Sequence, residues 1–154
     1  MSLDEKWIAE GATTFHGLLC KDFPNLLLTG PTQAGSTANF AFSLEVLAQH
    51  AKYILKEAGQ KLGTDKFTVE PTKEAEDAYS GEIAKRATKL AAVSTCTPSY
   101  INRESERPKD QDMATMLKGL RAGGWAEGII DYMRVLEEWR NDGKLEGLEI
   151  TSSA

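Results

Sequence analysis

The chain has 154 residues, of which 41% are hydrophobic, with 18 Lys and Arg against 23 Asp and Glu. This composition is that of one globular domain, and it excludes collagen-like, low-complexity and wholly disordered chains. A formal net charge of −5 argues against non-specific nucleic-acid binding, because such binding needs clustered basic residues.

Apolar runs and cysteines suggest the compartment. No apolar run approaches the roughly 20 residues that span a bilayer, and the N-terminal residues lack the apolar core of a secretory signal. The two cysteines, Cys20 and Cys96, are too few for a disulfide framework or for a zinc site built from CxxC pairs. We therefore expect a cytoplasmic protein without a membrane span.

The first predicted elements are a short strand and a long helix. The aliphatic run 26–29 lies between Pro24-Asn25 and Gly30-Pro31, which is typical of a strand buried on both faces. Apolar residues then recur at helical spacing, with Ser36 or Thr37 as the expected N-cap and an end near Gly59. The expected buried face of this helix comprises Phe40, Leu44, Leu47, Ala51 and Ile54.

A second short strand and a second helix follow. Phe67–Val69 predicts a strand that Pro71 stops, because proline cannot donate to a sheet ladder. Thr72 is the expected N-cap of the next helix, whose first turn carries Glu74 and Glu76 near the positive end of the helix dipole. Its predicted buried stripe is Ala75, Tyr79, Ile83, Ala87 and Leu90.

The last third of the chain predicts a long loop, a third helix and a final strand. The helical pattern fails between Val93 and Met113, and the glycine-rich residues 120–128 are expected to start the third helix. Asn141-Asp142-Gly143 should end that helix, and residues 147–150 predict a short strand. The predicted fold class is mixed α/β and helix-dominated, with three long helices and a few short strands.

One local motif is a candidate ligand site. Residues 30–37 nearly spell a nucleotide-binding P-loop, but Ser36 stands where that motif needs the lysine that meets the phosphates. An NTPase is therefore disfavoured. A turn between a strand and a helix still favours an anionic ligand edge, and a plain connection between the two elements is the alternative.

The histidines and cysteines carry no recognised motif. His16 and His50 are the only histidines, and neither belongs to a spaced metal motif. We expect His50 to be a packing or surface residue, His16 to serve backbone hydrogen bonding, and Cys20 to be a small buried apolar residue.

Three groups of residues together suggest a family. The first group is 3–7, Thr14-Phe15-His16-Gly17 and 22–31, with its Phe23-Pro24-Asn25 and Thr29-Gly30-Pro31. The second is the loop 96–104, which contains Thr97-Pro98-Ser99-Tyr100, and the third is the segment from Tyr132 through Trp139-Arg140 to 143–148. In this order they resemble the C-terminal portion of Baeyer-Villiger monooxygenases, closest to the fungal and steroid-type branch.

The resemblance implies a function and a cofactor site. Such enzymes are flavoproteins that use FAD and NADPH to insert oxygen next to a ketone. By this resemblance the flavin is lined by Gly30, Pro31, Thr32, Gln33, Ala34, Gly35 and Ser36, and the following helix points its positive end toward the ring. Tyr100 and Asn102 would belong to the loop over NADP and substrate.

The resemblance also implies what each part of the chain supplies. Residues 1–60 would be the end of the FAD-binding domain, an incomplete edge of a Rossmann-like domain, and 61–154 a C-terminal helical and loop region. Both GxGxxG motifs of the family are absent from the 154 residues, so we expect no oxygenase activity from this chain alone.

Two further hypotheses stay open from the sequence. The chain could be a stand-alone remnant reused as a binding protein, with an exposed apolar face covered by self-association or by a companion chain. It could also be a non-oxidative enzyme, such as an isomerase, that uses His16 as a base.

Overall fold

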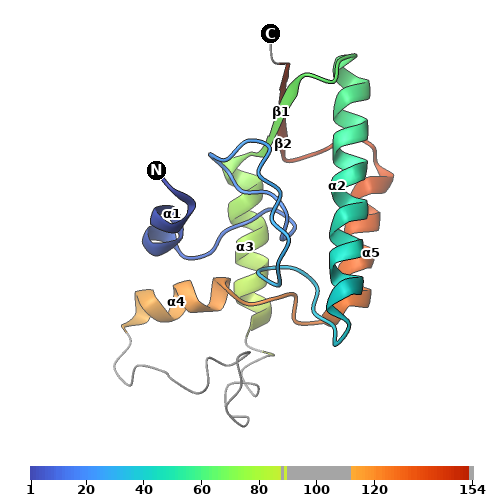
Figure 1. The fold of residues 1–154 in the computed structure, drawn as a ribbon. Helices are drawn as coiled ribbons and strands as arrows, with labels where there is room; N and C mark the ends of the chain where they lie inside the picture. Colours follow the sequence, from blue (N-terminus) through green and yellow to red (C-terminus); the bar gives the residue numbers. More distant parts are fainter. Residues whose placement is uncertain (88, 90–111, 153–154) are drawn as a thin grey trace.

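The computed structural model describes residues 1–87, 89 and 112–152, and these contain five helices and two strands (Figure 1). The helices are α1 (Leu3–Glu10), α2 (Phe40–Leu62), α3 (Lys73–Ala87), α4 (Met113–Arg121) and α5 (Gly128–Asn141). The strands are β1 (Phe67–Pro71) and β2 (Leu148–Ser152). The helix-dominated class with a few short strands is therefore confirmed.

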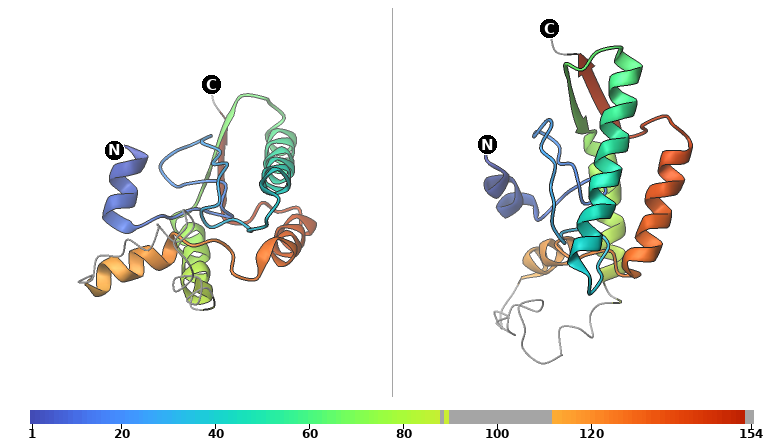
Figure 2. Two further views of the ribbon diagram at one scale, coloured as in Figure 1. Left: turned by 60° about the horizontal axis from the view of Figure 1, so that its bottom comes forward. Right: turned by 45° about the vertical axis from the view of Figure 1, so that its right-hand side comes forward.

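Helices α2 and α5 lie side by side, and the irregular segment 11–39 runs between this pair and α3 (Figures 1 and 2). Tyr132 and Leu136 of α5 are fully buried, as are Leu47 and Ile54 of α2. Leu18 and Leu19 of the irregular segment join the same apolar core, together with Ile83 of α3. The long helices thus bury a chain segment that has almost no regular structure of its own.

The two strands form one antiparallel pair that joins distant parts of the chain. Phe67 pairs with Ser152 and Pro71 with Leu148. Val69, at the centre of β1, is completely buried. Pro71 is the last residue of β1, as the sequence predicts, since proline has no N–H for the ladder.

Local capping explains where the helices begin. Ser2 and Glu5 form a capping box at α1, with the Ser2 hydroxyl accepting from the Glu5 N–H and the Glu5 carboxylate accepting from the Ser2 N–H. The Thr72 hydroxyl accepts from the Ala75 N–H at 3.1 Å, which confirms Thr72 at the start of α3. Gly63 ends α2 in the left-handed conformation, with φ of 66°.

Two predictions about the first strand and helix are wrong. Residues 26–29 form no strand, and Leu26 is 36% exposed. The Leu28 N–H donates to the Leu18 carbonyl at 2.7 Å, so the segment is tied to a neighbouring loop rather than to a sheet. Helix α2 begins at Phe40 with Asn39 as N-cap, not at Ser36 or Thr37, and Phe40 is 55% exposed.

The remaining predicted boundaries are nearly right. Helix α2 extends three residues beyond Gly59, α5 ends at Asn141, and β2 contains most of the predicted final strand. The glycine-rich residues 120–128, predicted as a helix start, are mostly a connection, because α4 ends at Arg121, residues 122–127 join the two helices and α5 begins only at Gly128. Helices α1 and α4 were not predicted, and residues 90–111, with most of the predicted long loop, lie outside the described residues.

Among the described residues, no helix combines the length and the apolar character needed to cross a bilayer.

Candidate functional site

The candidate cofactor loop, residues 30–36, has one half that faces the protein interior. Gln33, Ala34 and Gly35 are buried. The Trp125 N–H donates to the Ala34 carbonyl at 2.9 Å, and the Ile129 N–H donates to the Ser36 carbonyl at 3.1 Å. The loop is therefore hydrogen-bonded to the connection before α5 and to the first turn of that helix.

Close packing with two neighbours holds the buried half in place. A Cβ added at Gly35 would lie 2.6 Å from Cδ1 of Tyr132. Gly17, which has φ of +64°, approaches the loop so closely that a Cβ there would lie 2.8 Å from the Cβ of Ala34. Neither glycine position leaves room for a side chain, so the loop backbone sits directly against α5 and against the turn at residue 17.

The other half of the loop reaches the surface. Pro31 and Ser36 are exposed, and Gly30 and Thr32 are partly exposed. A Cβ added at Gly30 would meet nothing within 4 Å. These four residues can line a ligand, whereas Gln33, Ala34 and Gly35 can act on a ligand only by holding them.

The backbone N–H groups of this loop are not all free for an anion. The Gln33 N–H donates to the Gly123 carbonyl at 2.9 Å, and the Ala34 N–H donates to the Pro31 carbonyl at 3.3 Å. The positive end of α2 lies beyond the loop, where the Asn39 side chain accepts from the Phe42 N–H. Any helix-dipole effect on a ligand must therefore come from residues 39–42 rather than from Thr37.

Tyr100 and Asn102, the predicted residues of the NADP and substrate loop, lie outside the described residues, as does Cys96.

The two histidines form a buried pair that the sequence does not reveal. Nδ1 of His16 lies 3.0 Å from Nε2 of His50, and both side chains are buried. The His16 ring stacks on Phe15 and meets Trp139 edge-on, and the His16 carbonyl accepts from the Tyr132 hydroxyl at 2.7 Å. His50 is thus a packing residue, and no observation supports His16 as an accessible base.

Burial sets the protonation of this pair. Desolvation, then the neighbouring charges of His50 and Arg140, lowers the pKa of His16 well below its usual value. Desolvation, with a smaller contribution from Arg140, lowers the pKa of His50 to about 3. Both imidazoles are therefore neutral at pH 7.

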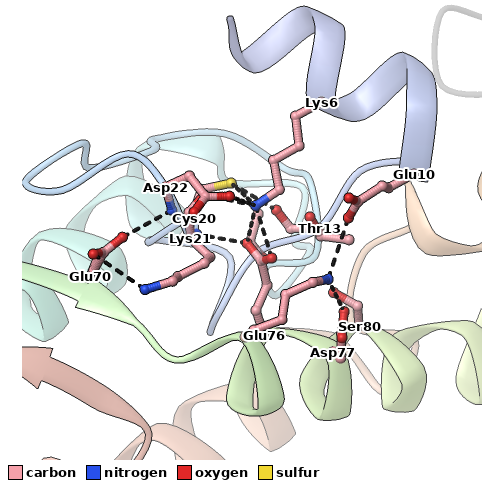
Figure 3. Close-up of polar contacts among 12 residues, drawn as sticks. Lys6, Glu10, Thr13, Cys20, Lys21, Asp22, Glu70, Glu76, Asp77 and Ser80 are labelled. Atoms are coloured by element: carbon pink, nitrogen blue, oxygen red, sulfur yellow. Dashed lines mark hydrogen bonds and ion pairs between the residues drawn. The ribbon is translucent and has the colours of Figure 1, made fainter. Parts of the chain in front are cut away.

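A buried ion pair links α1 to α3 (Figure 3). The Lys6 ammonium lies 3.0 Å from Oε2 of Glu76, and both side chains are buried (1% and 0% exposed). Lys6 also donates to the Lys21 carbonyl at 2.7 Å, and Glu76 accepts from the Lys21 N–H at 2.9 Å. Glu76, which the sequence predicts as a dipole-stabilising residue, is thus the buried partner of a lysine.

Cys20 lies beside this pair, and its thiol is protonated at pH 7. Its sulfur lies 3.5 Å from the Lys6 nitrogen, and the side chain is completely buried. Desolvation, reinforced by the Glu76 carboxylate, raises the pKa of the Cys20 thiol to about 12. The prediction of a small buried residue is confirmed. Within residues 1–87, 89 and 112–152, no group of three His, Cys, Asp or Glu side chains is placed to hold a metal ion.

In the comparison with known proteins, this chain matches one part of larger monooxygenases. No protein-family profile matches the chain. It is 43% identical over 154 residues to a polycyclic ketone monooxygenase from Thermothelomyces thermophilus, a match that covers 99% of this chain and 23% of the relative. It is 37% identical to an FAD-binding monooxygenase, ausC, from Aspergillus calidoustus, covering 98% of this chain and 23% of that relative.

Solved structures agree. A polycyclic ketone monooxygenase from the thermophilic fungus Thermothelomyces thermophila matches with a TM-score of 0.90 and 42% identity, over 99% of this chain and 23% of that one. A steroid monooxygenase bound to NADP shares the fold over 99% of this chain and 25% of its own, with a TM-score of 0.68 and 19% identity. The resemblance to Baeyer-Villiger flavoprotein monooxygenases is confirmed, and the chain spans less than a quarter of the length of these curated relatives.

Proposed function

We propose that this chain, a homologue of a segment of the Baeyer-Villiger flavoprotein monooxygenases, is the C-terminal part of such an enzyme and supplies one wall of its flavin site. The observation that carries the proposal is 43% identity over 154 residues to 23% of a polycyclic ketone monooxygenase. The partners of this wall are then FAD, NADPH and a small-molecule ketone, with most of the cofactor-binding surface supplied by residues outside these 154.

An aliphatic segment left half-exposed supports a role within a larger protein. Residues 26–29 have the sequence of a strand buried on both faces, yet Leu26 is exposed and Leu27 only partly buried. Two adjoining open hollows lie between this segment and α2 and share Leu27 and Leu55. Additional chain, such as the remainder of a Rossmann-like FAD domain, would complete the burial that the sequence anticipates.

The loop 30–36 fits a flavin edge only through its outer half. Gly30, Pro31, Thr32 and Ser36 can contact a planar ring by backbone and small side chains, whereas Gln33, Ala34 and Gly35 hold that surface from behind. Bound FAD would supply the activation of oxygen. The loop would orient the ring edge and keep water from it.

The domain division belongs to the same proposal. Residues 1–60 would finish the FAD-binding domain, and 61–154, with Tyr100 and Asn102, would form the side that meets NADP and ketone. The chain alone lacks both GxGxxG motifs, so it should neither hold FAD tightly nor oxidise a ketone.

A chimera tests the proposal. The matched 23% of the Thermothelomyces polycyclic ketone monooxygenase is replaced by this chain, and FAD binding and ketone-stimulated NADPH oxidation are measured. We expect FAD binding and turnover from the chimera, and neither from the isolated chain. A chimera that folds, by circular dichroism, but binds no FAD would contradict the proposal. Saturable, tight FAD binding by the isolated chain would favour an independent cofactor protein instead.

A further inference from the structure

The side chain of Gln33, in the buried half of the loop 30–36, makes hydrogen bonds with several segments of the chain. Its side chain is completely buried, and its φ of +58° lies in the left-handed region that most residues avoid. Oε1 accepts from the Thr14 N–H at 2.9 Å and from the Thr14 hydroxyl at 2.7 Å. Nε2 donates to the carbonyls of Ala12 and Arg121, each at 2.9 Å.

These partners leave no doubt about the orientation of the amide. A backbone N–H can only donate and a carbonyl can only accept, so the oxygen must face Thr14 and the nitrogen must face Ala12 and Arg121. The hydroxyl of Ser80, on α3, lies 3.2 Å from both Oε1 and Nε2 and completes the set. A glutamate would keep the acceptors and lose the donors, and a methionine would lose both.

Both backbone polar groups of Gln33 are also hydrogen-bonded. Its N–H donates to the Gly123 carbonyl at 2.9 Å, and its carbonyl accepts from the Tyr79 hydroxyl at 2.7 Å. One residue thus ties the loop 30–36 to the segment 12–14, to α3 and to the connection after α4. These anchors all act on the buried Gln33, whereas Thr32 is partly exposed and Ser36 is exposed.

We propose that Gln33 is a positioning residue, which never touches the flavin and instead holds Thr32 and Ser36 in one arrangement for it. The inference rests on the proposed function above. It changes the role of Gln33 from a contact of the cofactor, as the resemblance implies, to the anchor behind the contacts. Without the anchor, the outer half of the loop would sample several conformations, and FAD would have to order it on binding.

The first test needs no cofactor. Hydrogen exchange is measured on the 154-residue chain and on Gln33→Met, with Gln49→Met as the matched control, since Gln49 is an exposed glutamine whose side chain donates to Glu45 on the same helix. We expect exchange of the Trp125 and Ile129 amides, which donate to the loop, to accelerate by about ten- to a hundredfold in Gln33→Met and to stay unchanged in Gln49→Met. The amides in the middle of α2 should not respond. Equal acceleration throughout the chain would overturn local positioning and leave a general structural residue.

A milder variant covers the case in which Gln33→Met does not fold. Ser80→Ala removes one partner of the amide and keeps the others. Loss of one hydrogen bond should accelerate the same two amides by about fivefold, again without a change in α2. If exchange of these two amides is unchanged in Ser80→Ala, the proposal is overturned.

The second test uses the chimera. Gln33→Met should raise the Kd for FAD by about tenfold or more, while Gln49→Met leaves it unchanged. Faster local exchange with an unaltered Kd would overturn the link between the anchor and the flavin. If the unsubstituted chimera binds no FAD, the proposed function fails and the flavin role fails with it, whereas the exchange experiment still reports whether Gln33 anchors the loop.

Discussion

At the scale of single residues, the His16–His50 pair makes stability depend on pH. In the unfolded chain both imidazoles titrate near 6.5, whereas burial lowers both pKa values in the folded chain. Below pH 6.5 the unfolded state therefore binds more protons than the folded state. The free energy of unfolding does not depend on these histidines' protonation above pH 6.5, and it decreases as the pH falls from 6.5 toward their folded-state pKa values.

The expected slope is large enough to measure. Below pH 6.5 the free energy of unfolding should fall by about 1.4 kcal/mol per pH unit for each buried histidine. Urea unfolding at pH 7.5, 6.0 and 5.0 checks this, with His50→Leu as the comparison. That variant should be less stable at pH 7.5 but lose less stability on acidification. Parallel pH profiles for the two proteins would contradict the assignment.

The Lys6–Glu76 pair predicts a second effect at this scale. Replacing Lys6 by Met leaves a buried carboxylate without its counter-charge and should cost about 3–5 kcal/mol. The matched control is Arg134, a half-exposed side chain that pairs with Asp131 and Glu138, and Arg134→Met should cost less than about 1 kcal/mol. Urea unfolding provides both values.

A double variant distinguishes the charge from the packing. In Lys6→Met with Glu76→Gln, no buried charge is left unpaired, and the amide oxygen can still accept from the Lys21 N–H. Its cost should fall below the sum of the two single costs by more than 1 kcal/mol. Additive costs would mean that the two side chains contribute independently.

Charged residues are where prediction from sequence failed at this scale. Lysines and glutamates lie at surfaces by default, so nothing in the sequence distinguishes Lys6 or Glu76 from their exposed neighbours. Cys20 followed its ordinary preference for burial and was predicted correctly. Gln33 was singled out for its position in a motif, but the direction of its side chain depends on partners that are distant in sequence.

At the scale of elements, periodicity predicted the long helices and missed the short ones. Helices α2, α3 and α5 carry extended apolar stripes. Helix α1 has only 8 residues, and its one clear signal was the capping box of Ser2 and Glu5. The run 26–29 was misjudged because its pattern describes a strand covered on both faces, whereas in the described part of the structure it pairs with no strand and Leu26 is exposed.

Two glycines in the loop 30–36 offer a comparison at this scale. Gly35→Ala forces a Cβ to within 2.6 Å of the Tyr132 ring, whereas Gly30→Ala meets nothing within 4 Å. The first should cost about 1–3 kcal/mol through overpacking against α5, and the second should change stability by less than about 0.5 kcal/mol. Thermal unfolding of both variants checks this. Similar melting temperatures would mean that α5 shifts freely to accept the methyl group.

At the scale of the whole molecule, β2 closes the core. A chain ending at Gly147 loses the only strand in the described part of the structure that pairs with β1, including Ile150, the cross-strand partner of the buried Val69. We expect this truncation to unfold at a markedly lower urea concentration than a chain ending at Ser152, the control that keeps β2. Equal midpoints would show that β1 is held without β2, by its contacts with α2 and by its hydrogen bonds with Asn25.

The assembly of distant segments could not be predicted from local patterns. The fold class follows from periodicity, but the meeting of segment 12–14, Gln33 and the connection after α4 depends on side-chain hydrogen bonds across the chain. The family resemblance singled out the loop 30–36. The resemblance does not indicate which residues of the loop are exposed, because this depends on the close packing of Gly35 against Tyr132 and of Ala34 against Gly17.

The pairing of β1 with β2 also limits when the chain can fold. Phe67 must find Ser152, a partner far along the sequence, and closing so long a loop makes the pairing slow. Until residues 148–152 have been synthesised, the edge of β1 that pairs with β2 stays open. Such an edge is a template for other strands. The pairing of β2 therefore protects β1 from other strands as well as completing the sheet.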